Sequence, residues 1–195
     1  MSRRTETIPV RYFDDLYTAD ADPWQFRTSP YERDKYAATL AMLDRPRYGS
    51  ALEIGCSVGV FTRLLAPRCD RLLAIDGSEV ALDAAREECR GLSQVTFRVA
   101  TVPDAFPAGP FDLIVMAEVL YYLTAKDVAR TADMARNALC PTGRILCCHW
   151  LGETDYPLTG DDAVLALAAA LGPDTFVQDT QRHDAYRLDF FRLRS

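Results

Sequence analysis

Short apolar runs alternate along most of the chain with longer stretches of helical periodicity. Runs typical of buried strands occupy residues 50–54, 71–75, 111–117 and 144–148, and residues 95–99 alternate as a further strand. Between them, apolar positions recur every three or four residues, as on one face of a helix. This alternation is typical of a parallel sheet whose strands are joined by crossover helices. The sequence therefore predicts an α/β fold, doubly wound around a mostly parallel sheet.

Capping residues place the longer helices in the second half of the chain. Thr124 is a preferred N-cap residue and predicts a helix that reaches about Leu139. Asp161 or Asp162 is predicted to cap an alanine-rich helix that ends at Leu171. The first of these helices follows an apolar run, as the crossover helices of a parallel sheet do.

The C-terminal part departs from the parallel pattern. Residues 141–143, with the sequence Pro-Thr-Gly, predict a turn before the strand at 144–148. The final segments 175–181 and 186–193 alternate polar and apolar residues, which is typical of paired antiparallel strands. With these two strands the predicted sheet has seven strands, mostly parallel, with an antiparallel C-terminal edge.

The first 48 residues differ from the rest. Residues 11–31 are rich in aromatic and acidic side chains, and residues 32–43 have helical character. The aromatic segment either packs over the end of the sheet or forms a lid over a ligand, and the sequence leaves both readings open. We therefore divide the chain into an N-terminal cap or lid, residues 1–48, and a ligand-binding domain, residues 49–195.

Composition and charge narrow the classes of function. The chain has 195 residues, of which 49% are apolar, and its formal net charge is −6. An acidic chain lacks the basic face that nucleic-acid binding requires, so no nucleic-acid partner is predicted. No run approaches the roughly 18 consecutive apolar residues of a membrane helix, so no membrane partner is predicted either.

Cysteine and histidine usage favours a reducing compartment and no metal. The six cysteines include no Cys-x-x-Cys pair, and the N-terminus lacks the apolar run of a signal peptide. We therefore expect reduced thiols and a cytoplasmic protein. The two histidines, His149 and His183, do not lie at metal-ligand spacing from other ligating residues, so no metal site is predicted.

A glycine-containing turn follows the first predicted strand. Gly55 and Gly59 let the backbone approach a ligand closely and let the following helix pack against the sheet. Asp76 ends the second predicted strand, where a carboxylate can accept hydrogen bonds from ribose hydroxyls. Together these residues predict a nucleotide-type ligand.

The turn favours S-adenosylmethionine over a nicotinamide dinucleotide. Its glycines follow the pattern G-x-x-x-G, with Ser57 at the intermediate position, instead of the dinucleotide pattern G-x-G-x-x-G. Glu53 precedes the first glycine, where its carboxylate can face the cationic amine of a methionine-type ligand. The same carboxylate would repel the pyrophosphate of a dinucleotide.

These motifs give the chain a family resemblance. Residues 53–59, Asp76 and the block 111–123 resemble the motifs of class I S-adenosylmethionine-dependent methyltransferases. The tripeptide Asp-Pro-Trp at 22–24 and Pro-Tyr-Glu-Arg at 30–33 resemble more narrowly the NodS-like branch, as do the Glu-Ile-Gly-Cys turn and Ala-Glu-Val-Leu-Tyr-Tyr-Leu within the longer motifs. Members of that branch are small N-methyltransferases associated with amino-sugar or chitooligosaccharide modification. The resemblance covers roughly residues 12–148.

The resemblance implies the cofactor S-adenosyl-L-methionine and the product S-adenosyl-L-homocysteine. It implies that Glu53 and the two glycines hold the methionine half and that Asp76 takes the ribose. One position departs from the family pattern, since Thr101 stands where an aspartate often contacts the adenine amino group. The candidate cofactor-binding residues are Tyr31, Arg33, Glu53, Gly55, Ser57, Gly59, Asp76, Gly77, Ser78, Thr101 and Glu118.

Residues just beyond the fourth and fifth predicted strands are the candidates for chemistry. Open α/β sheets bind ligands at the carboxyl ends of their strands, and Glu118 and His149 occupy such positions. We take Glu118, His149 and Tyr122 as candidate catalytic residues, with His149 as a candidate base. In the alternative reading, Glu118 caps the following loop and His149 only packs. Candidate substrate-binding residues are Trp24, Tyr121, Trp150 and Tyr156.

The sequence thus predicts methyl transfer to an amine or hydroxyl of a small molecule, such as an amino sugar or glycan, with an amine favoured. The partner is a small-molecule or saccharide acceptor, and both a monomer and a homodimer are compatible with the sequence. Two alternatives remain at this point. One is a dinucleotide-dependent oxidoreductase, and the other is a cofactor-binding protein without catalysis.

Overall fold

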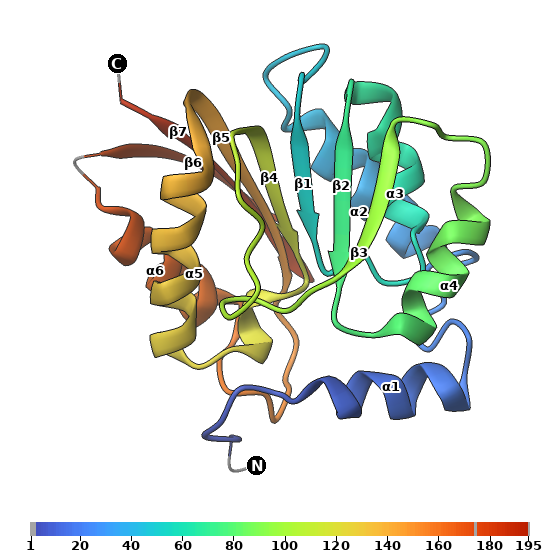
Figure 1. Ribbon diagram of the computed structural model, residues 1–195. Helices are drawn as coiled ribbons and strands as arrows, with labels where there is room; N and C mark the ends of the chain where they lie inside the picture. The colour runs from blue at the N-terminus through green and yellow to red at the C-terminus, as the bar shows by residue number, and fades with distance from the viewer. Residues whose placement is uncertain (1–2, 174, 195) are drawn as a thin grey trace. The chain divides into compact units, whose positions relative to one another are not determined.

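The computed structural model describes residues 3–173 and 175–194 (Figure 1). The chain forms two compact units, one made of Pro9–Thr101 and the other of Met1–Ile8 with Val102–Ser195. The predicted division at residues 48 and 49 does not separate these units. The reason is that the aromatic N-terminal segment packs on the helices that follow the first two strands, so it belongs to the same unit as they do.

The unit formed by residues 9–101 has three parallel strands in the order β3-β2-β1. Ala51 pairs with Leu72, and Leu72 pairs in turn with Val95. The apolar runs predicted at these positions therefore form neighbouring strands of one sheet. The elements are α1 (Val10–Ala19), α2 (Pro30–Ala41), β1 (Ala51–Ile54), α3 (Val60–Leu65), the 3-10 helix η1 (Ala66–Arg68), β2 (Leu72–Asp76), α4 (Glu79–Glu88) and β3 (Val95–Val99).

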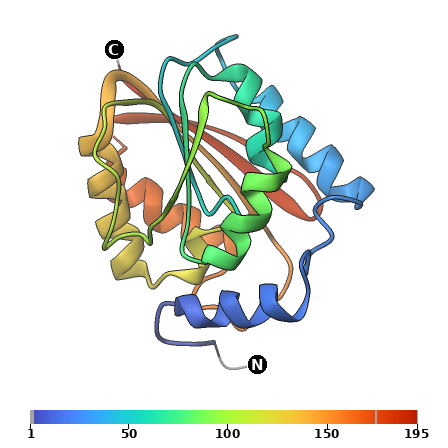
Figure 2. The same ribbon diagram turned by 45° about the vertical axis from the view of Figure 1, so that its right-hand side comes forward.

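The other unit has four strands in the order β4-β5-β7-β6. The β4–β5 pair is parallel, and the β5–β7 and β7–β6 pairs are antiparallel. Helices α5 and α6, yellow and orange-red in Figure 2, lie against each other in this unit. The elements are β4 (Phe111–Ala117), the 3-10 helix η2 (Leu120–Tyr122), α5 (Ala125–Ala138), β5 (Leu139–Trp150), α6 (Gly160–Leu171), β6 (Phe176–Arg182) and β7 (Tyr186–Leu193).

With three strands in one unit and four in the other, the predicted fold class is confirmed: seven strands, mostly parallel, with an antiparallel C-terminal edge. The most apolar of the predicted runs forms β4, whose residues 113–116 have no exposed surface. Such burial on both faces explains why this segment lacks the alternation of a half-exposed strand.

Two local expectations are corrected. Helix α6 is capped by the Thr159 side chain, which accepts from the Asp162 backbone N–H, so neither Asp161 nor Asp162 is the cap. The expected turn at residues 141–143 lies inside β5, because the pairing of β4 and β5 shifts register between Phe111 and the residues that follow it. The extra residues of β5 are absorbed as an irregularity of the strand.

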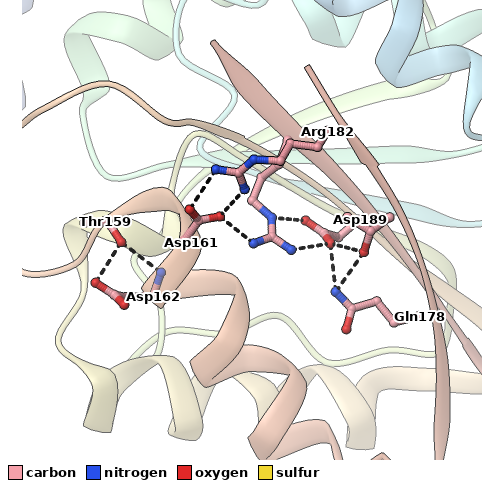
Figure 3. A network of polar contacts seen from close by, with 8 residues as sticks. Thr159, Asp161, Asp162, Gln178, Arg182 and Asp189 are labelled. Carbon is pink, nitrogen blue, oxygen red and sulfur yellow. Dashed lines mark hydrogen bonds and ion pairs between the residues drawn. The ribbon is translucent and has the colours of Figure 1, made fainter. Parts of the chain in front are cut away.

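The antiparallel edge is joined to α6 by a network of charges that runs from the exposed Arg182 to the buried Asp189 (Figure 3). Asp161, in the first turn of α6, accepts from both Arg182 on β6 and Arg187 on β7 at 2.7 Å. Arg187 also donates to Asp189 at 2.8 Å through two of its nitrogens. Burial opposes ionisation of Asp189, but hydrogen bonds from Arg187, Thr180 and Gln178 outweigh it and lower the pKa. This fully satisfied network fixes α6 on the two edge strands.

No helix among the described residues is long and apolar enough to cross a membrane.

Candidate functional site

The glycine turn after β1 has the backbone conformation that its sequence predicts. Gly55 and Gly59 have φ angles of 74° and 82°, in the left-handed region that favours glycine. A Cβ atom at Gly59 would lie 2.9 Å from Cα of Ala85 on α4. Gly59 therefore allows α3 to begin in direct contact with α4. Ser57 also has a positive φ, 52°, although it carries a side chain, so the turn stores some strain.

Asp76, at the end of β2, organises this turn. One carboxylate oxygen accepts from the Ser57 backbone N–H and the other from the Ser78 backbone N–H, both at 2.9 Å. Burial raises the pKa of Asp76, and the backbone hydrogen bonds from Ser78, Ser57 and Gly77 act against that rise. Because each carboxylate oxygen has a second lone pair, Asp76 can still accept hydrogen bonds from a pair of ligand hydroxyls.

Helix α1 covers the turn and lies beyond the carboxyl ends of β1 and β2 (Figure 1). The Ser78 hydroxyl donates to Asp14 at 2.6 Å, and the Tyr17 hydroxyl donates to Ser57 at 2.6 Å. Asp14 and Tyr17 are not among the site residues that the sequence motifs predict. Their spacing of three residues, which puts two side chains on one face of a helix, is the signal that would have found them.

Gly77 and Thr101 lie side by side in the same unit. A Cβ atom at Gly77 would meet Val10 of α1 at 2.9 Å and the Thr101 methyl group at 3.0 Å. Thr101 is exposed. The structure therefore brings the predicted adenine-side position next to the residues that follow Asp76.

Glu53 is buried, and 3% of its surface is exposed. Its Oε2 atom has no hydrogen-bond partner, and the same holds for the hydroxyl of nearby Thr62 on α3. Burial, with a smaller contribution from Asp76, raises the pKa of Glu53 to about 8, and Thr62 offsets the rise in part. The carboxyl group is thus mostly protonated at neutral pH until a cation approaches it.

The predicted residues of α2 are not all brought to the turn. Arg33 is 73% exposed and pairs with its neighbour Asp34 at 3.3 Å, and its role as a cofactor-binding residue stays a prediction. The buried cation of α2 is instead Lys35, which binds Glu32 at 3.0 Å. Lys35 lies 5.3 Å from the ring centre of Tyr31, which is exposed.

Trp24 belongs to an aromatic group in the unit of residues 9–101. Its ring packs edge-on against Tyr17 at 5.7 Å and stacks on Phe26 at 5.6 Å. This aromatic group packs against Val58 in the glycine turn and Ala81 on α4. The described contacts of Trp24 therefore belong to the aromatic cap over the turn, and its role in acceptor binding stays a prediction.

Glu118 follows β4 in the other unit and has a φ angle of 57°, strained for a residue with a side chain. Its Oε2 atom accepts from the Tyr121 hydroxyl at 2.7 Å and from the Trp150 backbone N–H at 2.8 Å. The carboxylate is therefore held in one position by the loop after β4 and by the end of β5. Such a fixed carboxylate can orient a donor group or receive its proton.

His149 lies near the end of β5, which pairs with the strand that Glu118 follows, but it has a different role. Its side chain has no exposed surface, and Nε2 accepts from the Leu120 backbone N–H at 3.2 Å. The lone pair needed to take a proton is therefore engaged, and the ring is the neutral tautomer with the proton on Nδ1. The prediction of His149 as catalytic base is corrected: it holds η2 in place.

Three tyrosines form one cluster around η2. Tyr121 contacts Tyr122 edge-on at 4.7 Å and stacks on Tyr156 at 5.6 Å, and Tyr122 contacts Tyr156 at 4.7 Å. Burial, followed by the charge of Glu118, raises the pKa of Tyr121, so its hydroxyl stays protonated and donates. Trp150 is partly exposed at the end of β5. The predicted residues beyond β4 and β5 thus come together as one group.

No group of three or more metal-ligating side chains was found among residues 3–173 and 175–194.

Comparison with known proteins identifies relatives. A family model described as nodulation protein S matches residues 14–143. Nodulation protein S of Bradyrhizobium diazoefficiens is 39% identical over 117 residues, which cover 60% of this chain and 55% of the relative. Nodulation protein S of Rhizobium tropici is 41% identical over 158 residues, which cover 75% of this chain and 63% of the relative. The chain thus spans little more than half the length of these curated relatives.

Comparison with solved structures also identifies a relative of this chain. The N-methyltransferase NodS from Bradyrhizobium japonicum, solved in complex with S-adenosyl-L-homocysteine, is similar with a TM-score of 0.82 and 25% identity. The match covers 95% of this chain and 98% of that structure. The family model, which matches more than half of the chain, and these relatives agree with the glycine turn and the strand-end residues described above. The chain belongs to the nodulation protein S family.

Proposed function

We propose that the chain is an S-adenosylmethionine-dependent methyltransferase that methylates an amine of a small molecule or saccharide. The observation that carries this proposal is the partly buried Asp76 carboxylate, fixed by two backbone N–H groups at the glycine turn with lone pairs left for two ligand hydroxyls. Family membership supports it, since a family member has been solved with S-adenosyl-L-homocysteine.

The residues of the glycine turn fit this cofactor. Asp76 would take the ribose hydroxyls, and the turn between Gly55 and Gly59 would let the methionine half approach the backbone. Glu53 offers a buried carboxyl oxygen without a partner, which fits the cationic amine of that half. Thr101, beside Gly77, would face the adenine side. When bound, the cofactor supplies a sulfonium whose methyl group is open to in-line attack.

Glu118 is the residue of this chain that we assign to the acceptor. A neutral amine that attacks the methyl carbon forms a C–N bond while the C–S bond breaks, and the nitrogen then loses one proton. Glu118, fixed by Tyr121 and Trp150, would orient the amine and receive that proton. The rings of Tyr122, Tyr156 and Trp150 would pack against the apolar face of the acceptor.

An amino sugar or a deacetylated glycan combines an amine with an apolar ring face, so we place the acceptor in this class. We also place the activity in the cytoplasm. None of the six cysteines, all of which lie in the described part of the chain, forms a disulfide.

The Glu118→Gln variant tests the assignment. Glutamine keeps the size of the side chain but cannot take up a proton, so we expect kcat to fall by about a hundredfold, in the range of general-base effects. The dissociation constant of S-adenosylmethionine is expected to stay within about twofold of the wild-type value. The measurement is transfer of a labelled methyl group to glucosamine, deacetylated chitotetraose and ethanolamine.

The control is Glu79→Gln on α4, which removes an exposed carboxylate paired with Arg86 and is expected to leave turnover unchanged. If Glu118→Gln turns over at the wild-type rate with an acceptor that the wild type methylates, Glu118 is not the group that handles the proton. If the wild type methylates none of the three classes of amine, the proposed acceptor class is wrong.

A further inference from the structure

Residues 3–8, which we call the N-terminal arm, are bound along the edge of the tyrosine cluster. The Ile8 backbone N–H donates to the Tyr122 carbonyl at 2.8 Å. The Arg4 backbone N–H donates to the Asp155 carbonyl at 2.8 Å, and the Arg3 guanidinium donates to the Tyr156 carbonyl at 3.0 Å. The arm therefore binds the backbone of two of the three tyrosines directly.

Thr7 fastens the middle of the arm to the start of α5. Its hydroxyl donates to Asp127 at 2.6 Å and accepts from the Thr124 backbone N–H at 3.0 Å. Thr124 is itself the N-cap of α5 and directly follows Leu123, the residue after η2. The Thr7 side chain thus satisfies the backbone N–H of the N-cap residue of α5, two residues after the end of η2. The hydrogen bond from Thr7 is the largest of the effects that lower the pKa of Asp127.

The loop of residues 152–158, which we call the acceptor loop, also contacts η2 and the tyrosine cluster. Its Leu158 backbone N–H donates to the Tyr121 carbonyl at 3.3 Å. Tyr156 reaches the cluster through ring contacts with Tyr121 and Tyr122. Hydrogen bonds are more directional than ring contacts, and the arm supplies hydrogen bonds to this loop from Arg3 and Arg4.

We propose that the N-terminal arm is a positioning element for the acceptor, which holds the acceptor loop and η2 so that the three tyrosines form one binding surface. This proposal rests on the proposed function of that surface. None of the arm residues is assigned a contact with the reacting atoms. Loss of the arm contacts is therefore expected to change acceptor binding and to leave cofactor binding intact.

The individual contacts of the arm differ in how much they contribute to holding it in place. The Arg4–Asp155 ion pair has side chains that are 42% and 41% exposed, so water screens it and it contributes little. The Thr7 hydroxyl makes two hydrogen bonds, one of them to a carboxylate, and backbone N–H groups make two more. The informative changes are therefore Thr7→Val, which keeps the shape of the side chain, and Arg4→Pro, which removes the backbone donor.

The first experiment needs no acceptor. We expect the double variant Thr7→Val, Arg4→Pro to lose amide hydrogen-exchange protection across residues 152–158 and to show a reduced near-ultraviolet circular dichroism signal of its tyrosines. Thr7→Ser, which retains the hydroxyl, is expected to restore the Thr7 contribution. Unchanged exchange and an unchanged signal in the double variant would overturn the proposal, whatever the enzyme methylates.

The second experiment measures kinetics with deacetylated chitotetraose as the acceptor. We expect KM for this probe to rise about tenfold in the double variant, which corresponds to about 1.4 kcal/mol. We expect the dissociation constant of S-adenosylmethionine to stay within about twofold, since the cofactor residues lie in the other unit. The matched control is Arg136→Ala, which breaks an exposed arginine–aspartate pair of similar exposure on α5 and is expected to leave both values unchanged.

The two proposals fail in different ways. A wild-type protein that methylates none of the amines contradicts the proposed acceptor class, while the exchange experiment still decides whether the arm orders the loop. An equal loss of S-adenosylmethionine binding and acceptor binding in the double variant would contradict the arm as an acceptor-side element, because general destabilisation affects both.

Discussion

Asp76→Ala is expected to weaken S-adenosylmethionine binding by at least about a hundredfold. The substitution removes the acceptor for two ribose hydroxyls and also releases the Ser57 and Ser78 backbone N–H groups that fix the turn. Hydrogen bonds to a charged group contribute about 1.5–3 kcal/mol each, so the loss of two accounts for a change of this size. Isothermal titration with S-adenosylmethionine measures it.

The Asp76→Asn variant distinguishes a hydrogen-bonding role of Asp76 from a purely steric one. Both carboxylate oxygens accept from N–H groups, so an amide at this position must point its NH2 group toward one of those donors. We therefore expect Asn to bind the cofactor nearly as poorly as Ala, which a purely steric role would not produce. Asp83→Ala, which removes an exposed carboxylate of α4, is the control. A folded Asp76→Ala protein that binds the cofactor within about threefold of wild type would refute the ribose assignment.

The strands could be predicted because their signal is local. β1 is followed by a glycine, β2 ends in an aspartate, and β4 is followed by a glutamate. Each of these strands is a short, mostly apolar run, because a strand buried in a sheet must have apolar side chains wherever it lies in that sheet. Helix α1 gave no such signal. Pro9 stands at its N-cap position, and no side chain there accepts a hydrogen bond from the helix. The helix instead depends on tertiary contacts, through Asp14 and Tyr17, that the sequence does not display.

The identities of the strand-end residues could be predicted, but their environments could not. Glu118 and His149 follow neighbouring strands, as the motifs indicate, yet the engagement of His149 depends on where η2 turns back toward the end of β5. The sequence likewise cannot show that Lys35 and Glu32 are buried. A lysine and a glutamate three residues apart on a helix usually form a solvent-exposed pair, and only the packing of α2 decides otherwise.

Glu53 is the buried group with the largest expected effect on stability. It has one carboxyl oxygen without a partner, and its surroundings contribute acidic or neutral groups: Asp76 at the end of β2, the thiols of Cys56, Cys69 and Cys89, and the Thr62 hydroxyl on α3. Thr62 offsets the effect only in part, and none of the other groups carries a positive charge that would compensate an ionised Glu53. Burial therefore raises the pKa of Glu53 from an ordinary value of 4.5 to about 8.

The sign of the pH dependence follows from proton counts. Between the unfolded pKa of 4.5 and the folded value of about 8, the folded protein keeps a proton on Glu53 that the unfolded chain has lost. The free energy of unfolding therefore decreases as pH rises through this range, and above it the full cost of a buried charge is present. At about 1.4 kcal/mol per pKa unit, the cost is at most about 5 kcal/mol.

We therefore expect Glu53→Gln to be more stable than the wild type at alkaline pH. Glutamine is neutral at every pH and has the same shape, so the variant loses the decrease in stability that Glu53 causes. Urea unfolding at about pH 5.5, 7 and 8.5 should show a difference between variant and wild type that grows with pH. Glu87→Gln, an exposed carboxylate of α4, is the control and is expected to follow the wild type. Parallel stability curves for Glu53→Gln and the wild type across this range would mean that Glu53 is ionised in the folded protein, and hence that a cation or water compensates it before any cofactor binds.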